Sequence, residues 1–329
     1  MKMVYNLWGI KVKKLAEEIR SGRRLNRSDD LSQLLTADLE ELRAGADTIR
    51  RELCGDRFDF CTIINGRSGR CGEDCKFCAQ SCHHNTHVKE YPFLPEEDIL
   101  AEGKRNEAAG VHWYSIVTAG RDLHGQELER GLAAYRRLRK ETGLALCASH
   151  GLQTLEELKA LKEAGVTRFH ANLETSRRYF PMICTSHTYQ DKIDNILRAK
   201  EAGLQVCSGG ILGMGESWED RIDMALSLAE LEVDSIPLNL LTPIPGTPLE
   251  QVEPISQEDV LRAVALFRYI NPTAWIRMAA GRGRFPDGGE ALFRSGANAA
   301  ITGDMLTTTG TSVAGDMEMA IRLGYQLER

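Results

Sequence analysis

Apolar and polar positions along the chain follow a repeating unit: an amphipathic helix, a glycine and a short apolar strand. The glycines that end such helical segments are Gly110, Gly143, Gly165 and Gly203. Glycine accepts the left-handed backbone conformation that closes many helices. Helix starts carry a hydroxyl followed three residues later by an acid, at Thr154-x-x-Glu157, Thr188-x-x-Asp191, Ser217-x-x-Asp220 and Ser256-x-x-Asp259.

The repeat predicts eight strands, at residues 58–64, 112–118, 144–148, 167–172, 205–209, 234–240, 274–279 and 299–303. Strands that alternate with helices at this spacing form a parallel sheet. Eight in succession favour a closed (β/α)8 barrel of TIM type over an open sheet. We therefore expect an α/β fold with a helical extension over residues 1–57. The barrel would occupy residues 58–329 and end in a helix from about Gly315.

Composition narrows the class of protein. The net charge of −6 argues against a nucleic-acid partner, which would favour a basic surface. The charged N-terminus has no signal-peptide pattern and the chain has no apolar run that would span a membrane. Nine cysteines are an odd number, which disfavours a disulfide framework. We expect a cytoplasmic protein with reduced thiols.

Three of the cysteines, Cys71, Cys75 and Cys78, have C-x3-C-x2-C spacing. Three thiolates are one fewer than a closed [4Fe–4S] cluster needs, so the spacing predicts a cluster with one open iron. Zinc is the alternative, because zinc sites combine cysteine and histidine. Further candidate zinc ligands follow at Cys82, His83, His84 and His87. The size and regularity of the rest of the chain favour the iron–sulfur interpretation.

The segment Cys-Gly-Glu-Asp-Cys-Lys-Phe-Cys at residues 71–78 resembles the signature of the radical S-adenosylmethionine (SAM) superfamily. Other segments are similar to biotin synthases: residues 172–176, 188–190, 206–216, 237–249, 277–282 and 295–298, with Leu306 and Thr308-Thr309. Together they cover roughly residues 58–325. The resemblance implies a [4Fe–4S] cluster and SAM as cofactors. It also implies insertion of sulfur between C6 and C9 of dethiobiotin, an electron donor such as flavodoxin or ferredoxin, and a homodimer.

The resemblance also assigns roles to single residues. Implied SAM-binding residues are Phe77, Thr118, Ala119, Asn172, Glu174 and Ile211. Implied catalytic residues are Asn172, Asn239 and Arg277. An amide and an acid suit ribose hydroxyls, and the uncharged amide of Asn239 suits the urea-like ring of dethiobiotin. A strand-end cap, a loop hydrogen bond or simple packing is the alternative for each. His170 stands where the family usually has asparagine, so the substrate contacts there depart from the family pattern.

Arg277 interrupts an otherwise apolar predicted strand. A buried guanidinium without an anion costs several kcal/mol, so the barrel interior should contain a negative group. In typical biotin synthases this group is an auxiliary [2Fe–2S] cluster, held by three cysteines and one arginine, that gives up a sulfide. Cys147, Cys207 and Arg277 match three of those positions.

The fourth position differs, because Ser115 stands where the family has cysteine. Cys61 stands where the family has serine. We hypothesise a relocated ligand set of Cys61, Cys147 and Cys207 with Arg277, holding a [2Fe–2S] cluster or a 4Fe variant. The alternative is that each cysteine is a small buried apolar residue. Cys82 and Cys184 are further candidates for a ligand or a sulfur relay, and Cys54 is expected to be structural.

Two rival functions stay open at this point. One is a radical SAM enzyme of the same type with another substrate, such as a methylornithine synthase or a hydrogenase maturase. The other is a non-catalytic iron–sulfur sensor, which would need neither SAM nor a full barrel. Biotin synthesis is the function that the combined segments favour.

Overall fold

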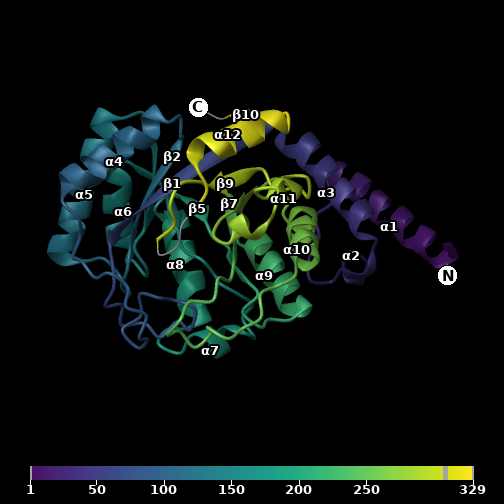
Figure 1. The fold of residues 1–329 in the computed structure, drawn as a ribbon, viewed down its shortest axis with the longest axis horizontal. Helices are drawn as coiled ribbons and strands as arrows, with labels where there is room; N and C mark the ends of the chain where they lie inside the picture. The colour runs from purple at the N-terminus through teal and green to yellow at the C-terminus, as the bar shows by residue number, and fades with distance from the viewer. Residues whose placement is uncertain (1, 307–309, 328–329) are drawn as a thin grey trace.

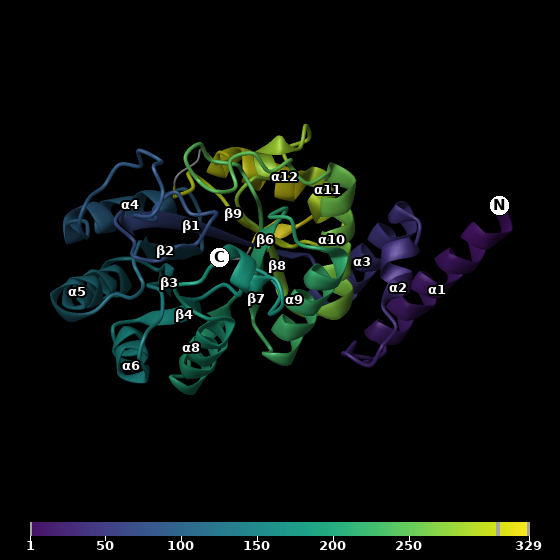
Figure 2. The ribbon, with the colours of Figure 1, turned by 90° about the horizontal axis from the view of Figure 1, so that it is seen from below.

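The computed structural model describes residues 2–306 and 310–327, with side chains from residue 11 onward. Its centre is a closed parallel barrel surrounded by helices (Figures 1 and 2). The strands are β1 (Arg57–Arg67), β2 (Trp113–Thr118), β3 (Ala145–Ser149), β4 (Val166–His170), β5 (Gln205–Cys207), β6 (Gly210–Leu212), β7 (Ser235–Leu240), β8 (Trp275–Met278) and β9 (Ala299–Ile301). β1 pairs with both β2 and β9, which closes the barrel. The predicted TIM-type (β/α)8 architecture is confirmed.

The helices of the outer ring are α4 (Glu96–Ala108), α5 (Gly125–Glu141), α6 (Leu155–Glu163), α8 (Tyr189–Glu201), α9 (Trp218–Glu230) and α10 (Gln257–Ile270). Short helices α7 (Phe180–Ile183), η1 (Arg282–Arg284) and α11 (Glu290–Phe293) lie in the loops, and α12 (Val313–Arg322) leads to β10 (Gln326–Leu327). The predicted caps are present. Thr154, Thr188 and Ser217 form full capping boxes, and the Ser256 side chain accepts from the Asp259 N–H.

Two local predictions were wrong. The fifth strand ends at Cys207 and resumes as β6, because Gly209 passes so close to β7 that a Cβ there would lie 2.0 Å from the Pro237 carbonyl oxygen. The second wrong prediction is that Gly143 ends a helix with a left-handed backbone. Helix α5 ends instead at Thr142, whose backbone is extended, and Gly143 does not have a positive φ. The other three helix-ending glycines, Gly110, Gly165 and Gly203, do have positive φ.

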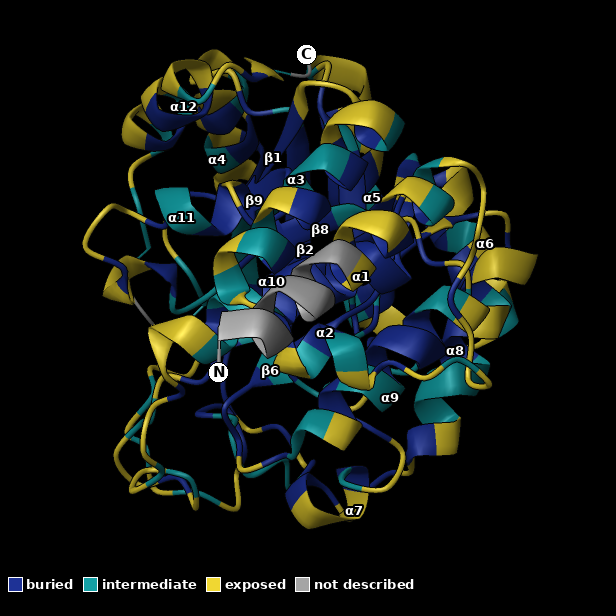
Figure 3. Cartoon of the chain, turned by 90° about the vertical axis from the view of Figure 1, so that its right-hand side faces the viewer, coloured by how far each residue is buried: buried dark blue, intermediate teal, exposed yellow. Residues whose placement is uncertain are grey.

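Three helices precede the barrel: α1 (Lys2–Arg20), α2 (Ser32–Thr36) and α3 (Leu39–Cys54). They lie together at one side of the barrel, next to α10 (Figure 2). Leu15 and Ile19 of α1 are buried, and the Tyr269 hydroxyl of α10 donates to the Val12 carbonyl at 3.2 Å. Buried residues follow the strands and the inner helix faces (Figure 3). None of the helices in the described ranges is both long enough and apolar enough to cross a lipid bilayer.

Candidate active site

The three spaced cysteines lie in the loop between β1 and α4, at the carboxyl end of the barrel where TIM-barrel active sites form. The loop is fixed by its own backbone: the Cys71 N–H donates to the Gln80 carbonyl, and the Cys82 N–H donates back to the Cys71 carbonyl at 2.8 Å. Cys71 is buried and Cys78 is half-buried. Burial raises the pKa of Cys78 to about 11. This thiol therefore keeps its proton when no metal is bound, and a bound metal would replace that proton. Three cysteine thiols on one loop are the kind of donor set that holds an iron–sulfur cluster.

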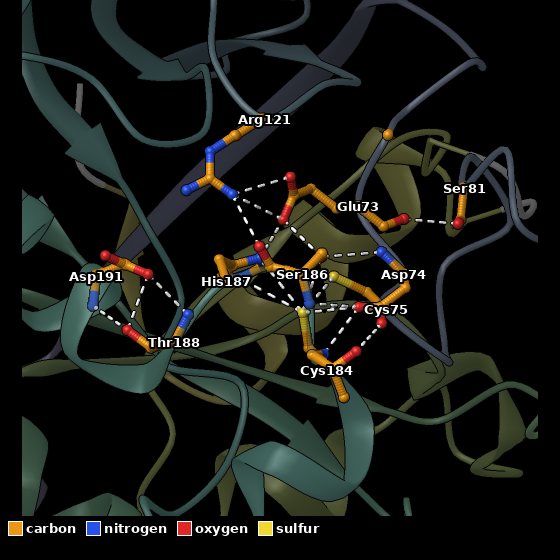
Figure 4. Close-up of polar contacts among 12 residues, drawn as sticks. Glu73, Asp74, Cys75, Ser81, Arg121, Cys184, Ser186, His187, Thr188 and Asp191 are labelled. Atoms are coloured by element: carbon orange, nitrogen blue, oxygen red, sulfur yellow. Dashed lines mark hydrogen bonds and ion pairs between the residues drawn. The ribbon is translucent and has the colours of Figure 1, made fainter.

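A second loop, between α7 and α8, holds the cysteine loop in place (Figure 4). The Asp74 carboxylate accepts the backbone N–H groups of Thr185 and Ser186 at 2.9 and 3.0 Å, and the Thr185 hydroxyl as well. These bonds outweigh the effect of burial and lower the pKa of Asp74 well below its usual value. The Glu73 carboxylate of the cysteine loop forms a hydrogen bond with the His187 ring of the second loop.

Cys184 belongs to this second loop and points at the cysteine loop (Figure 4). Its Sγ lies 3.7 Å from the Cys75 Sγ, 3.3 Å from an Asp74 oxygen and 3.3 Å from the His187 Nδ1. The hydrogen bond between the two sulfurs lowers the pKa of Cys184 to about 4. Among the described residues, Cys75, Cys184 and His187 form one group whose potential ligand atoms all converge within 4.8 Å.

The candidate zinc ligands that follow the cysteine loop do not converge on one point in this way. The His83 and His84 rings lie against backbone carbonyls of Gly72 and Cys78, at 3.1 and 3.2 Å, and the Cys82 side chain is exposed. Cys82, His83, His84 and His87, the candidate ligands of the zinc alternative, therefore share no common centre in the described part of the chain.

A pocket of about 220 Å³ opens at the barrel mouth beside the cysteine loop. It brings together four of the predicted residues: Phe77, Cys78, Ile211 and Asn239. Apolar side chains form most of its wall, which suits an uncharged substrate ring. The Asn239 amide already donates to the Gly210 carbonyl at 3.2 Å and accepts from the Ala280 N–H at 3.2 Å. In the structure its contacts are therefore those of a loop-fixing residue at the pocket wall.

Asn172 and Glu174 follow the end of β4 as predicted. The Asn172 amide donates to the Glu174 carboxylate at 3.3 Å and accepts from the Gly209 N–H at 3.0 Å. Glu174 has a left-handed backbone (φ 71°), and its carbonyl accepts from the Ile211 N–H. Burial raises the pKa of the Glu174 carboxyl. The strained turn and the interrupted strand thus fix both side chains at the mouth.

Thr118 and Ala119 lie apart from that pocket. The Thr118 hydroxyl is 3.0 Å from the His150 Nδ1, and the other ring nitrogen of His150 is 2.9 Å from the Tyr135 hydroxyl. Ala119 lines a separate surface pocket with Arg67 and Gly72. Burial, with a smaller contribution from the nearby Arg67 charge, lowers the pKa of His150 to about 3, so its ring is neutral.

Below the mouth, the barrel interior contains the other predicted cysteines. Cys61 on β1 and Cys147 on β3 pack together with Trp113, and Cys207 on β5 is also buried. The charge of each thiol influences the ionisation of its neighbours. Burial raises the pKa of Cys61 to about 12. Burial also disfavours a thiolate at Cys207, but His170 and the nearby arginines outweigh it and hold its pKa at about 7.

Arg277 has an anionic partner within the protein. Its Nη2 donates to the Asp59 carboxylate at 2.5 Å, and its Nη1 donates to the carbonyls of Asp59 and Ala300. The negative group expected beside Arg277 is therefore present as the Asp59 carboxylate, which pairs with this guanidinium without a cluster. A second buried arginine, Arg168, lies 3.6 Å from the same Asp59 oxygen. Two guanidinium groups share one carboxylate, so Asp59 balances only one of the two positive charges.

Sequence reasoning missed Asp59, Arg168 and His187, and it named Cys184 only as a candidate ligand or sulfur relay. Asp59 had a signal, because a charged residue between two phenylalanines in a buried strand needs a partner. Cys184-x-x-His187 had one as well, in its three-residue spacing after the fourth strand. Cys54 is buried against Arg268, as expected of a structural residue. Thr308-Thr309 lie outside the described residues.

Comparisons with known proteins agree with this geometry. Residues 67–228 match the family model of the radical SAM superfamily, and residues 237–326 match that of the biotin and thiamin synthesis associated domain. The biotin synthase of Clostridium beijerinckii is 60% identical over 96% of this chain and 100% of its own length. That of Alkaliphilus metalliredigens is 55% identical over 96% of this chain and 99% of its own.

The comparison of structures shows the same fold in more distant proteins. A crystal structure of methylornithine synthase has a TM-score of 0.83 at 21% identity and covers 96% of this chain and 97% of its own. The hydrogenase maturase HydG has a TM-score of 0.79 at 17% identity, covering 100% of this chain and 79% of its own. At these identities the likeness concerns the fold alone. Near-full-length identity, both family models and the cysteine loop at the barrel mouth lead to one assignment: the chain belongs to the biotin synthase family of radical SAM enzymes.

Proposed function

We propose that this barrel converts dethiobiotin to biotin and draws the inserted sulfur from an auxiliary iron–sulfur cluster in its interior. The observation that carries the proposal is that the mouth pocket adjoins both sets of cysteines: Cys78 lines it, and so does Ile63, which packs against Cys61 and Cys147. The cysteine loop lies at the mouth, the apolar pocket beside it, and the buried thiols of Cys61, Cys147 and Cys207 below. A substrate in the pocket would therefore lie between a radical source and a sulfur source.

The residues at the mouth fit the first cluster and SAM. Cys71, Cys75 and Cys78 would hold the cluster, with Asn172 and Glu174 on the opposite side of the mouth. When bound, these groups supply the electron and the 5′-deoxyadenosyl radical, and the inner cluster supplies the sulfur. Ile211 and Phe77 border the pocket and exclude water from it. We infer flavodoxin or ferredoxin as the electron donor and a cytoplasmic homodimer as the working form.

The interior residues fit a second cluster for an electrostatic reason. Asp59 neutralises one of the two buried guanidinium groups, and the other favours an anion. A cluster with thiolate ligands is such an anion. Cys207 already ionises near neutral pH, because His170, Arg168 and Arg277 favour its thiolate. Ser115, which stands in the family's cysteine position, is buried next to Cys147 and would be a neighbour of the cluster and not a ligand.

The test is an anaerobic incubation of the iron- and sulfide-loaded protein with SAM, a reductant and dethiobiotin, followed by mass spectrometry. We expect biotin together with 5′-deoxyadenosine. Cys61→Ser should lose iron and sulfide from the second cluster and abolish biotin formation, with SAM cleavage retained. Ser115→Ala is the matched control and should keep the full metal content. Unchanged iron and sulfide in Cys61→Ser would contradict the relocated ligand set.

The rival functions give different results in the same assay. 5′-Deoxyadenosine without biotin would indicate a radical SAM enzyme with another substrate. A sensor would form neither product from a fully loaded cluster.

A further inference from the structure

A second, larger pocket of about 920 Å³ lies at the opposite end of the barrel, where none of the proposed steps takes place. Its wall includes the first residues of three strands: Trp113 of β2, Gln205 of β5 and Trp275 of β8. It therefore opens at the amino ends of the strands, away from the cysteine loop.

Two of the residues that line the pocket, Trp113 and Arg168, are buried and lie next to the buried thiols. Trp113 lines the pocket with one part of its surface and packs against Cys61 and Cys147 with another. Arg168 lies flat on Trp113, with its Cζ 3.5 Å from the ring centroid, and is 3% exposed. The positive charge of Arg168 acts to lower the pKa of the thiols of Cys61, Cys147 and Cys207. Arg168 thus lies at the junction of the pocket and the proposed cluster chamber.

The hydrogen-bonding capacity of Arg168 is not used up within the protein. Its Nε is buried and has no hydrogen-bond partner. Its nearest carboxylate oxygen, on Asp59, is 3.6 Å from Nη1 and already accepts the 2.5 Å bond from Arg277. A buried cation in this position favours a small anion beside it.

Two of the three acidic groups that line the pocket are paired with cations, which weakens their repulsion of an incoming anion. Glu230 pairs with Arg27 at 2.7 Å, Glu232 pairs with Lys200 at 3.6 Å, and Asp234 accepts the Val206 N–H at 2.8 Å. Arg24 and His112 line the same pocket.

We propose that this pocket admits hydrosulfide, a small monoanion, and that Arg168 binds it on the way to the inner cluster. The inference rests on the proposed function, since each sulfur that leaves in the product has to be replaced. Delivery from the amino ends of the strands leaves the mouth closed around SAM and substrate. The step at Arg168 is binding and passage only, so no covalent bond forms or breaks there.

The experiment measures uptake of ³⁵S-sulfide into the full-length protein under anaerobic conditions. Cys71, Cys75 and Cys78 are replaced by alanine in every sample, so that the label reports the inner cluster alone. Arg168→Met removes the charge and retains the length of the side chain. Gln205→Trp narrows the pocket at an exposed residue, which protects the test against misfolding of the buried variant. Thr242→Trp is the matched control, an exposed residue at the mouth pocket.

We expect uptake to slow roughly tenfold in Arg168→Met, the effect of losing one charge-assisted hydrogen bond, and to slow in Gln205→Trp as well. Thr242→Trp should keep the parent rate. Equal rates in all variants, or slowing in Thr242→Trp alone, would overturn the route through this pocket while leaving the inner cluster intact. A protein that takes up no cluster sulfide at all, with or without Cys61, Cys147 and Cys207, would refute the proposed sulfur source itself.

Discussion

Asp59 is a single residue on which the barrel interior depends. Asp59→Asn would leave Arg277 and Arg168 without a carboxylate, and we expect the free energy of unfolding to fall by about 3–5 kcal/mol. Urea unfolding of the cluster-free protein measures the change. The matched control is Asp56→Asn, whose side chain is 60% exposed in its pair with Arg50 and should cost less than about 1 kcal/mol. Similar losses for both variants would contradict this role of Asp59.

His150 gives the protein a predictable response to acid. Its pKa is about 3 when folded and 6.5 in the unfolded chain, so the unfolded state takes up a proton first as the pH falls. This contribution to stability is complete above pH 6.5 and is lost as the pH falls towards 3. Between pH 7.5 and 5.5 the loss amounts to roughly 1.4 kcal/mol.

The measurement is urea unfolding of the wild type and His150→Gln at both pH values. The glutamine variant should be less stable than the wild type at pH 7.5. Its free energy of unfolding should then fall less between pH 7.5 and 5.5, because it lacks the contribution of His150. The same pH dependence in both proteins would show that another group is responsible.

Site residues could be predicted from the sequence when their partners lie close in the chain, and could not when the partners meet only in the folded barrel. The three cluster cysteines are set by spacing within eight residues, so they could be named before the structure. Asp59 and Arg168 are more than a hundred residues apart and meet only across the closed barrel. Their pairing depends on strand register, which the pattern of apolar residues does not specify. For the same reason Arg277 was correctly expected to be buried beside a negative group, whereas Asp59 was not identified as that group.

Among the elements, the interrupted fifth strand has the clearest consequence for function. A Cβ at Gly210 would lie 2.3 Å from the Glu174 carbonyl oxygen and 2.5 Å from the Met224 sulfur. Gly210→Ala should therefore displace the Glu174 turn and weaken SAM binding by roughly tenfold or more, as overpacking costs about 1–3 kcal/mol. Equilibrium dialysis with the cluster-loaded protein measures the affinity. Gly283→Ala, where a Cβ meets nothing within 4 Å, is the control and should bind SAM normally.

Helix starts were predicted well because a cap is a local motif. The hydroxyl and the acid of each capping box lie within one turn, so four residues contain the whole signal. The break between β5 and β6 is different, because it arises from the approach of Pro237 on β7 and of Glu174 in the loop after β4. The glycines were visible in the sequence, but the groups that require them were not.

At the scale of the whole molecule, the N-terminal helices and the barrel share one core. Ile19 of α1 is fully buried, so Ile19→Ala should lower the free energy of unfolding by about 2–5 kcal/mol in a single transition. Circular dichroism and the fluorescence of the barrel tryptophans should report the same midpoint. Lys14→Ala, at a side chain that is 74% exposed, is the control and should change stability by less than about 0.5 kcal/mol. Two separate transitions would indicate an extension that folds independently.

The bonds between Asp74 and the Thr185–Ser186 loop join segments 111 and 112 residues apart. On a ribosome, the cysteine loop would emerge roughly 5–20 s before the loop that fixes it. During that interval its thiols would be exposed and without their supporting contacts. Insertion of the first cluster therefore belongs after the loop between α7 and α8 has been synthesised, and the nascent chain needs protection from oxygen and competing metals until then.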